Sequence, residues 1–348
     1  MQEEEIRETD DLYEHFRFVA DKKQSLLRID RFLQNRIANV SRTRIQAAAA
    51  AGNVYVNGRP VKQNYKVKPE DVVTVLLPFP PRETEILPEN IPLDIVYEDE
   101  HLMVINKPAG MVVHPAQGNY TGTLVNALYW HLKDLPLFQK GEIRPGLVHR
   151  IDKNTSGLLL VAKNELALNK LARQFFDHKT ERKYVALVWG DLRDDAGTIR
   201  GNIARSTRDR KKMAVFEDED TGKPAVTHYR VLERFHYVTL VECTLETGRT
   251  HQIRVHFQHI RHPVFNDAEY GGNTILKGTA SSHYQQFVRH CFEIMPRHAL
   301  HARSLGFTHP VTGQNMFFES PLPPDMAEVV QRWRNLMAAR NKGKPETD

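Results

Sequence analysis

The sequence predicts an α+β protein in which a small α+β module precedes a larger domain built on a mainly antiparallel, mixed β-sheet. The length of 348 residues suits two domains rather than one. Short apolar runs joined by short turns dominate the second part, with few crossover helices between them. A proline-dense stretch separates the two parts, because prolines this close together forbid a helix and favour an extended linker.

These observations divide the chain into five segments. We expect an acidic, flexible leader at 1–25, the small module at 26–80, a proline-rich linker at 81–92, the larger domain at 93–335 and a polar C-terminal tail at 336–348. The leader begins with the acidic run Glu3–Glu5, whereas secretory and mitochondrial signals are not acidic. No apolar run approaches the roughly 18 residues that a membrane-spanning helix needs. Because Cys243 and Cys291 are the only cysteines, a disulfide framework is excluded and we expect a cytoplasmic protein.

The small module combines two short helices with a hairpin. Apolar residues recur at helical spacing from Ile29 to Ile37. Ser41 offers an N-cap for a second helix, and Gly52 offers a stop for it. The pair Asn57-Gly58 predicts a hairpin turn, and residues 72–77 have the pattern of a closing strand.

The charge of this module is strongly basic. Between residues 28 and 68, Asp30 is the only acidic residue, against Arg28, Arg31, Arg36, Arg42, Arg44, Arg59, Lys62, Lys66 and Lys68. A solvated helical face that happens to be basic is the plain alternative. The runs Ser41–Arg44, Gly52–Val54 and Val56–Gly58 resemble the S-four RNA-binding module of ribosomal proteins and tRNA synthetases. The resemblance implies RNA binding, with Arg28, Arg31, Arg42 and Arg44 as the expected contacts.

The larger domain alternates short strands with occasional helices. Strands are expected at 94–97, 102–105, 184–189, 225–231, 237–244 and 316–318. An amphipathic helix is expected from Asn164 to about Lys179, and a second one from Gln252 to Ile260.

Polar residues gather between two apolar runs in the middle of this domain. One run ends at Val148, and a second, buried strand is expected at Leu158–Ala162. Two strands would hold the intervening loop rigidly, as catalytic groups require. Within that loop Asp152 lies between Arg150 and Lys153, which favour an ionised carboxylate that is able to act as a nucleophile. The alternative is a solvated turn in which Asp152 pairs with Lys153.

Four runs in this domain resemble, in the same order, motifs of the large-subunit ribosomal pseudouridine synthases. The run His149–Leu159 resembles the catalytic loop of that family, with Ile151 in place of the usual leucine. The others are Asn106–Gly110 with His114-Pro115, Arg182–Ala186, and Leu245–His256. The likeness extends from about residue 26 to 330, and the S-four-like module in front points to the D-like branch of the family.

The resemblance implies an isomerase that converts specific uridines in structured RNA to pseudouridine. Asp152 would be the catalytic carboxylate, Tyr184 would stack on the target uracil and assist proton removal from its C5, and Arg254 would pair with Asp152. The expected RNA contacts are Arg150, which touches a phosphate or helps extrude the nucleotide, and Lys107, Lys211 and Lys212. The expected partner is 23S ribosomal RNA or the assembling large subunit, with no membrane and no obligate protein partner. The chemistry requires neither a metal nor an organic cofactor.

Several alternatives stay open. The histidines His251, His256, His259 and His262 suggest a metal site, although RNA contact or helix capping fits their spacing better. The run 118–122 bears glycines but lacks the dinucleotide fingerprint. The basic run Arg205–Lys212 is either a flexible surface loop or a loop that grips RNA. Tyr184 fits core packing as well as stacking, and the whole chain fits a non-catalytic RNA-binding or ribosome-assembly factor that retains the fold.

Overall fold

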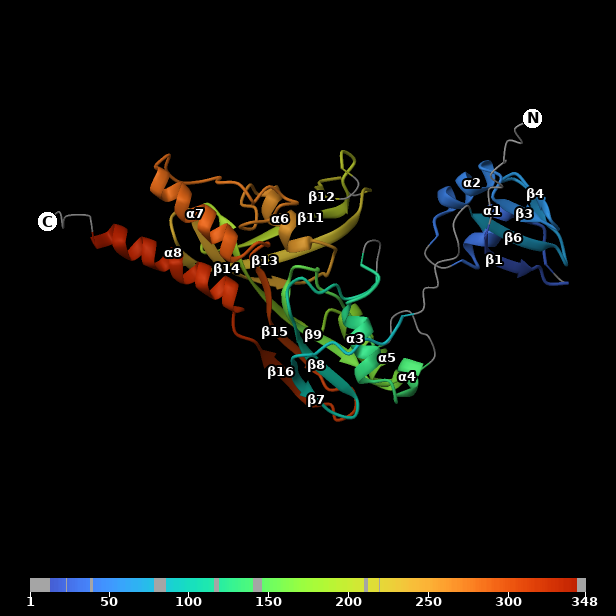
Figure 1. The fold of residues 1–348 in the computed structure, drawn as a ribbon, viewed down its shortest axis with the longest axis horizontal. Helices are drawn as coiled ribbons and strands as arrows, with labels where there is room; N and C mark the ends of the chain where they lie inside the picture. The colour runs from blue at the N-terminus through green and yellow to red at the C-terminus, as the bar shows by residue number, and fades with distance from the viewer. Residues whose placement is uncertain are drawn as a thin grey trace, which may run out of the picture. The chain divides into compact units, whose positions relative to one another are not determined.

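The computed structural model describes residues 13–22, 24–37, 40–77, 86–115, 119–139, 146–209, 212–218 and 220–342. The chain divides into two compact units, Met1–Glu85 and Ile86–Asp348 (Figure 1). Each unit has a hydrophobic core of its own. The arrangement is α+β, as the sequence predicts.

The smaller unit packs two helices against a small sheet. Its sheet runs in the order β1 (Tyr13–Val19), β6 (Val72–Leu77), β3 (Val54–Val56) and β4 (Arg59–Pro60), while β2 (Leu27–Arg28) pairs with β5 (Lys66–Val67). The helices are α1 (Ile29–Gln34) and α2 (Arg42–Ala50). The Ser41 side chain caps α2 by accepting a hydrogen bond from the Arg44 amide at 3.3 Å. Ile29, Phe32 and Leu33 are fully buried, so the predicted helical spacing marks the core face.

Strand β1 lies inside the segment that the sequence predicts as a flexible leader. It pairs antiparallel with β6 along its length, from Tyr13 opposite Leu77 to Val19 opposite Val72. For residues 13–19 the prediction is wrong, because acidic composition says nothing about a distant strand that can satisfy the backbone groups of this segment. Residues 78–85, which include the start of the proline-rich linker predicted at 81–92, lie outside the described residues.

The larger unit is built on one large sheet. In order across it run β12 (Met213–Phe216), β11 (Ala196–Arg205), β13 (Lys223–Arg234), β14 (Val238–Leu245), β10 (Glu181–Trp189), β15 (Leu300–Thr308), β9 (Ser156–Ala162), β8 (Leu102–Lys107) and β7 (Ile95–Glu98), with β16 (Asn315–Glu319) beside β15. The pair β15–β9 is parallel, and the other described strand pairs of this sheet are antiparallel. The sheet is therefore mixed and mainly antiparallel.

Helices cover the sheet at both ends. Figure 1 shows α3 (Leu124–His131), α4 (Pro136–Gln139) and α5 (Glu165–Phe176) at one end, and α6 (Gln252–His259), α7 (Ser282–Ile294) and α8 (Pro324–Lys342) at the other. Helix α8 continues through Lys342, into the predicted polar tail. Burial explains the difference, because Trp333 is fully buried and Leu336 and Met337 pack against the main core. Within the described residues, no helix combines the length and apolarity needed to cross a membrane.

Strand β9 is buried along its whole length because both of its faces are covered. Leu159 and Val161 face the main core, which includes residues of α3. Leu158 and Leu160 face a second apolar cluster that includes Ala167 of α5. The alternation of side chains along a strand places these two sets on opposite faces. A rigid strand thus begins four residues after Asp152.

Candidate active site

Asp152 lies in a loop that leads directly into β9. The apolar run before it is not a strand, because only Leu147 makes an isolated bridge, to Val161. Other contacts hold the loop: the amide of Thr155 donates to the Asp152 carbonyl at 3.1 Å. Just beyond it, a Cβ on Gly157 would meet the Ala302 carbonyl oxygen at 2.2 Å, so this close strand pairing requires glycine.

Lys107, which the sequence predicts as an RNA contact, is buried in the structure. Its side chain is 0% exposed, and its ammonium donates to the carbonyls of Pro108, Met111 and Lys153 at 2.7, 2.9 and 3.1 Å. Burial lowers the pKa of Lys107 to about 7, an effect that the charge of Asp152 opposes. A side chain enclosed in this way would have to rearrange before it could reach RNA, so the structure does not support the expected RNA contact, which stays a prediction. Instead Lys107 ties β8 to the Asp152 loop.

Arg254, on the first turn of α6, faces Asp152. Its Nη1 donates to the Asp152 carboxylate at 3.2 Å. Two further hydrogen bonds, at 2.7 and 2.9 Å, join the guanidinium to the buried carboxylate of Asp267, and Glu269 accepts a third. Burial alone lowers the pKa of Arg254, but its bond to Asp267 and the nearby carboxylate charges raise it well above its ordinary value. The cation beside Asp152 is therefore permanent and held in a fixed orientation.

His251 is a site residue whose position the sequence did not predict. It precedes α6 in a left-handed conformation, with φ of 55°, so its ring turns back toward the loop. Its Nε2 lies 4.0 Å from the Asp152 carboxylate, and its Nδ1 shares a 2.8 Å hydrogen bond with the Tyr270 hydroxyl. Burial lowers the pKa of His251, although the charge of Asp152 opposes this. In the sequence, only its place in the Leu245–His256 motif indicated that His251 belongs to the site. The motif alone does not predict which way the imidazole ring points.

Tyr184 belongs both to the core and to the site. On β10 it lies between Cys243 of β14 and Ala302 of β15, and only 8% of its surface is exposed. Burial raises the pKa of Tyr184, so the phenol keeps its proton. Its hydroxyl forms no hydrogen bond to any residue among those described. The ring lines the cavity beside Asp152, so the packing and stacking interpretations are compatible.

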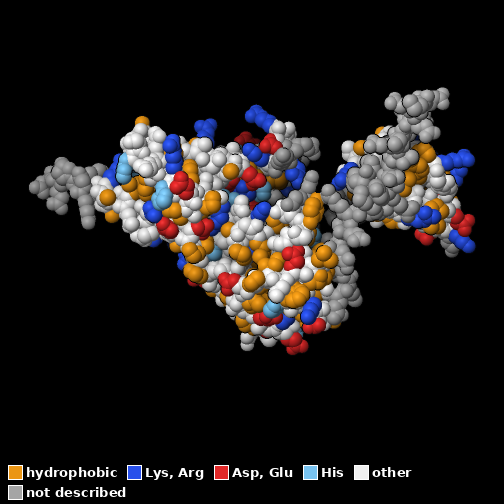
Figure 2. All heavy atoms as spheres, in the orientation of Figure 1, with side chains coloured by type: hydrophobic (Ala, Val, Ile, Leu, Met, Phe, Trp, Pro, Cys, Tyr) orange, Lys and Arg blue, Asp and Glu red, His pale blue; other side chains and the backbone are white. Residues whose placement is uncertain are grey.

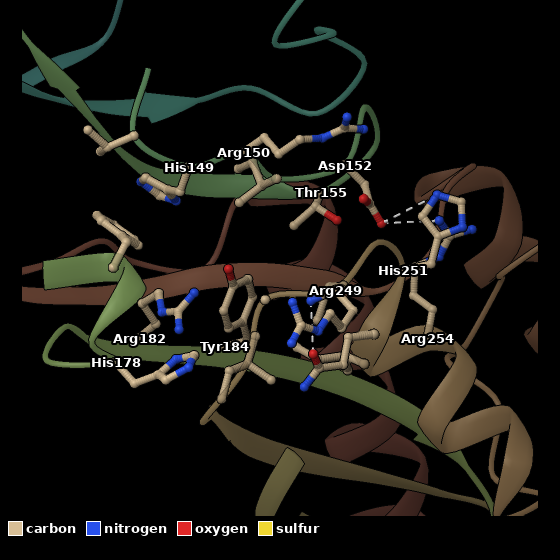
Figure 3. A pocket seen from close by; sticks show the side chains of 18 of the residues that line it. His149, Arg150, Asp152, Thr155, His178, Arg182, Tyr184, Arg249, His251 and Arg254 are labelled. Atoms are coloured by element: carbon tan, nitrogen blue, oxygen red, sulfur yellow. Dashed lines mark hydrogen bonds and ion pairs between the residues drawn. The ribbon is translucent and has the colours of Figure 1, made fainter. Parts of the chain in front are cut away.

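A cavity of about 490 Å³ joins these side chains. Figure 3 shows Asp152, His251 and Arg254 at one end, Tyr184 between, and His178 and Arg182 at the other end. Arg150 is exposed and also lines it. The cavity has the volume typical of ligand pockets. The structure thus brings together Asp152, Tyr184, Arg254 and Arg150 from distant parts of the sequence.

None of the other predicted RNA contacts is among the described residues that line this cavity. Arg31 and Arg44 are exposed on the smaller unit. Arg28 and Arg42 are half-buried there, at 3.1 and 2.9 Å from the carboxylate of buried Asp30. Lys212 lies between β11 and β12, 3.9 Å from Asp209, and Lys211 falls outside the described residues.

The histidine cluster of the sequence does not converge on one point. His256 bonds to Thr227 and His262 to the Trp189 carbonyl, at 2.8 and 2.7 Å, while His251 faces Asp152. Among the described residues, no group of three or more His, Cys, Asp or Glu side chains is arranged to hold a metal ion.

Comparison with known proteins adds independent evidence. The RNA pseudouridylate synthase family model matches residues 101–259, and the S4 domain model matches residues 27–73. A protein of Chlorobaculum parvum named an uncharacterized RNA pseudouridine synthase is 50% identical over 92% of this chain and 98% of its own. Ribosomal large subunit pseudouridine synthase D of Zymomonas mobilis is 45% identical over 86% of this chain and 91% of its own. The solved structure of human RNA pseudouridylate synthase domain containing 4 matches with a TM-score of 0.52 and 25% identity, over 69% of this chain and 92% of that one.

Proposed function

Because this chain belongs to the RNA pseudouridylate synthase family and is therefore an isomerase, we propose that it modifies specific uridines of large-subunit (23S) ribosomal RNA with Asp152 as its catalytic carboxylate. The observation that carries the assignment of Asp152 is its pairing with Arg254 at one end of a cavity that Tyr184 also lines.

The reaction breaks the bond between N1 of uracil and C1′ of ribose, turns the base, and joins C5 to C1′. Asp152 either attacks C1′ directly or assists formation of a glycal by proton removal from the sugar. In both routes uracil leaves with the electron pair of the broken bond. When C5 bonds to C1′, it displaces the carboxylate in the first route, and the sugar regains its lost proton from the carboxyl group in the second. C5 then loses a proton and N1 gains one, so atoms and charge balance.

The neighbouring side chains fit supporting roles in this scheme. Arg254 orients the carboxylate through a guanidinium that Asp267 already fixes, so no reorganisation is needed during the reaction. Tyr184 offers a ring face to the turned base, and its protonated hydroxyl is available for proton exchange at C5 through a base or water. Arg150 is exposed and lines the cavity, which supports a contact with the RNA backbone as the nucleotide flips out.

The RNA partner is supported by both units. The smaller unit matches the S4 domain and exposes Arg31 and Arg44. On the visible face of the larger unit, acidic and basic side chains are interspersed (Figure 2), so this face presents no broad basic surface to the RNA. Relatives carry the name ribosomal large subunit pseudouridine synthase D, which points to 23S ribosomal RNA. Cys243 and Cys291 are free and buried, which fits the reducing cytoplasm proposed as the location.

Tritium release tests the proposal. Purified protein is incubated with 23S ribosomal RNA labelled at C5 of uracil, because bonding at C5 expels that hydrogen. Tritium release by wild type, together with no release by Asp152→Asn, would support Asp152 as the catalytic carboxylate. Mapping pseudouridines in the RNA of a deletion strain then identifies the sites. Binding without release would favour the non-catalytic RNA-binding factor.

A further inference from the structure

The end of the cavity away from Asp152 contains a buried cation. Arg182 of β10 is 8% exposed and lines the cavity. Its Nε is buried without a hydrogen-bond partner, and among the described residues no carboxylate lies within 4 Å of its guanidinium. A buried charge without a counter-ion is costly, so proteins rarely retain one unless a ligand or a metal supplies the missing charge.

The residues around Arg182 leave its positive charge available to bind an anion. Its guanidinium lies 5.5 Å from the ring centroid of Phe175, whose ring stacks with His149 at 4.5 Å. Burial, and then the charge of Arg182, lowers the pKa of His149 to about 3, so that histidine is neutral and accepts a hydrogen bond from the Leu160 amide. Aromatic contact supports the guanidinium without neutralising it. The positive charge therefore stays available to the cavity.

An exposed aromatic ring also lines this cavity. Phe176, the last residue of α5, is 74% exposed, the highest value among the large hydrophobic residues that the structure describes. It lines the cavity together with Arg182, and Arg173 lies 5.4 Å from its ring centroid. Single exposed hydrophobic residues are common. An exposed ring and a buried cation that line one cavity form the combination that binds a base and its phosphate.

We propose that Arg182 binds a phosphodiester group next to the target uridine and that Phe176 stacks on the neighbouring base. The inference rests on the proposed function, since Asp152 and Tyr184 define where the target nucleoside lies. A guanidinium matches two phosphate oxygens with two parallel hydrogen bonds. A nucleotide that spans the cavity from Asp152 past Tyr184 brings one of its phosphates to the Arg182 end (Figure 3).

The first test compares uridine with uridine 3′,5′-bisphosphate as probes of the full-length protein. In nuclear magnetic resonance titrations, wild type should bind the bisphosphate about tenfold more tightly or better, the increment expected of charged hydrogen bonds. Arg182→Met should remove this preference and leave uridine binding unchanged, whereas Arg182→Lys should keep part of it. Arg332→Gln is the matched control, because Arg332 is paired with Glu328 on the exposed side of α8.

A thermal melt separates binding from structure. Arg182→Met should melt at the wild-type temperature or above it, because the methionine removes an unpaired buried charge and keeps the volume. A lower melting temperature would make Arg182 a structural residue and overturn the proposal. The proposal would also be overturned if Arg182→Met preferred the bisphosphate over uridine as strongly as wild type does, or if wild type showed no such preference.

The second test concerns Phe176. Phe176→Ala should bind a uridine trinucleotide roughly 5- to 100-fold more weakly than wild type, while its affinity for the bisphosphate is unchanged. Phe317→Ala is the control, since Phe317 is 56% exposed on β16 and does not line the cavity. The stacking role would be overturned if Phe176→Ala and Phe317→Ala lost trinucleotide affinity equally, or if Phe176→Ala lost none. Tritium release by wild type tests the proposed function separately, so the results distinguish a failure of the proposed function from a failure of the roles proposed for Arg182 and Phe176.

Discussion

Nη1 of Arg254 lies 3.2 Å from Oδ2 of Asp152, although 102 residues separate the two in the chain. The same guanidinium makes two hydrogen bonds to the fully buried carboxylate of Asp267. Asp267 therefore fixes the orientation of Arg254, and Arg254 in turn presents one N–H to Asp152. This chain of contacts makes the contributions of the three side chains separable by substitution.

Asp152→Asn should abolish turnover while preserving the fold. The amide fills the same volume but is not a nucleophile, so we expect a rate loss of roughly 10³-fold or more. The melting temperature should change little, because Arg254 keeps its bonds to Asp267 and Glu269. Single-turnover tritium release measures the first effect. Activity within about tenfold of wild type would remove Asp152 from the catalytic role.

Arg254→Lys should be far more damaging than its retained charge suggests. An ammonium cannot reproduce the planar fork that serves Asp267 and Asp152 together. We expect a loss of about 2–4 kcal/mol in transition-state stabilisation, measured as single-turnover rate at saturating RNA.

Asp267→Asn is the companion variant for this prediction. It weakens the anchor of Arg254 but leaves the contact with Asp152, so its rate loss should be smaller than that of Arg254→Lys. A near-normal rate in the lysine variant would show that only charge neutralisation matters at this position.

Tyr184→Phe should separate chemistry from packing. Because the Tyr184 hydroxyl has no hydrogen-bond partner among the described residues, its removal should leave the melting temperature unchanged. If the hydroxyl helps to move the C5 proton, the rate should fall by about 10²–10⁴-fold. A fully active variant would limit Tyr184 to stacking and packing.

Tyr184→Ala cannot test stacking alone, because the ring is also part of the main core. We expect that variant to lose about 3–5 kcal/mol of unfolding free energy.

Removal of the smaller unit should weaken RNA binding and leave the chemistry unchanged at saturating RNA. The variant begins at Ile86, where the second compact unit starts. If three or four basic side chains of the smaller unit contact phosphates, the log–log salt slope should fall by roughly 2–4 units. Filter binding at several salt concentrations measures it. An unchanged slope would show that this unit binds something other than RNA.

The stability of the smaller unit should depend on acid pH through Asp30. Burial by itself raises the pKa of Asp30, but hydrogen bonds from Gln46, Arg42 and Arg28 outweigh it and hold the pKa well below its usual range. A carboxyl with a lowered pKa stabilises the fold above its unfolded pKa of about 4, and loses this contribution as the pH falls toward the folded value. In the full-length protein, Asp30→Asn should lower the melting temperature at pH 7, with a difference that shrinks below about pH 4. A constant difference would contradict this.

Local structure was largely readable from the sequence. The Ser41 cap, the turn at Asn57-Gly58 and helix α6 reflect short-range rules, and each appears close to its predicted place. Elements whose stability comes from distant partners were missed, among them β1 and the end of α8. Short motifs were also sufficient to single out Asp152, Tyr184 and Arg254, although their roles stay predictions.

By itself, then, the sequence determined the fold class and the family and singled out candidate site residues, because those depend on local spacing and on motifs. The tertiary structure alone decided which side chains are buried and what they face. Lys107 and Arg150 are both basic residues, yet packing encloses the first and leaves the second exposed. Arg28 and Arg42 face Asp30, whereas Arg182 lines a cavity and has no carboxylate partner among the described residues. Burial and electrostatic partnership depend on segments far apart in the chain, and no local pattern contains that information.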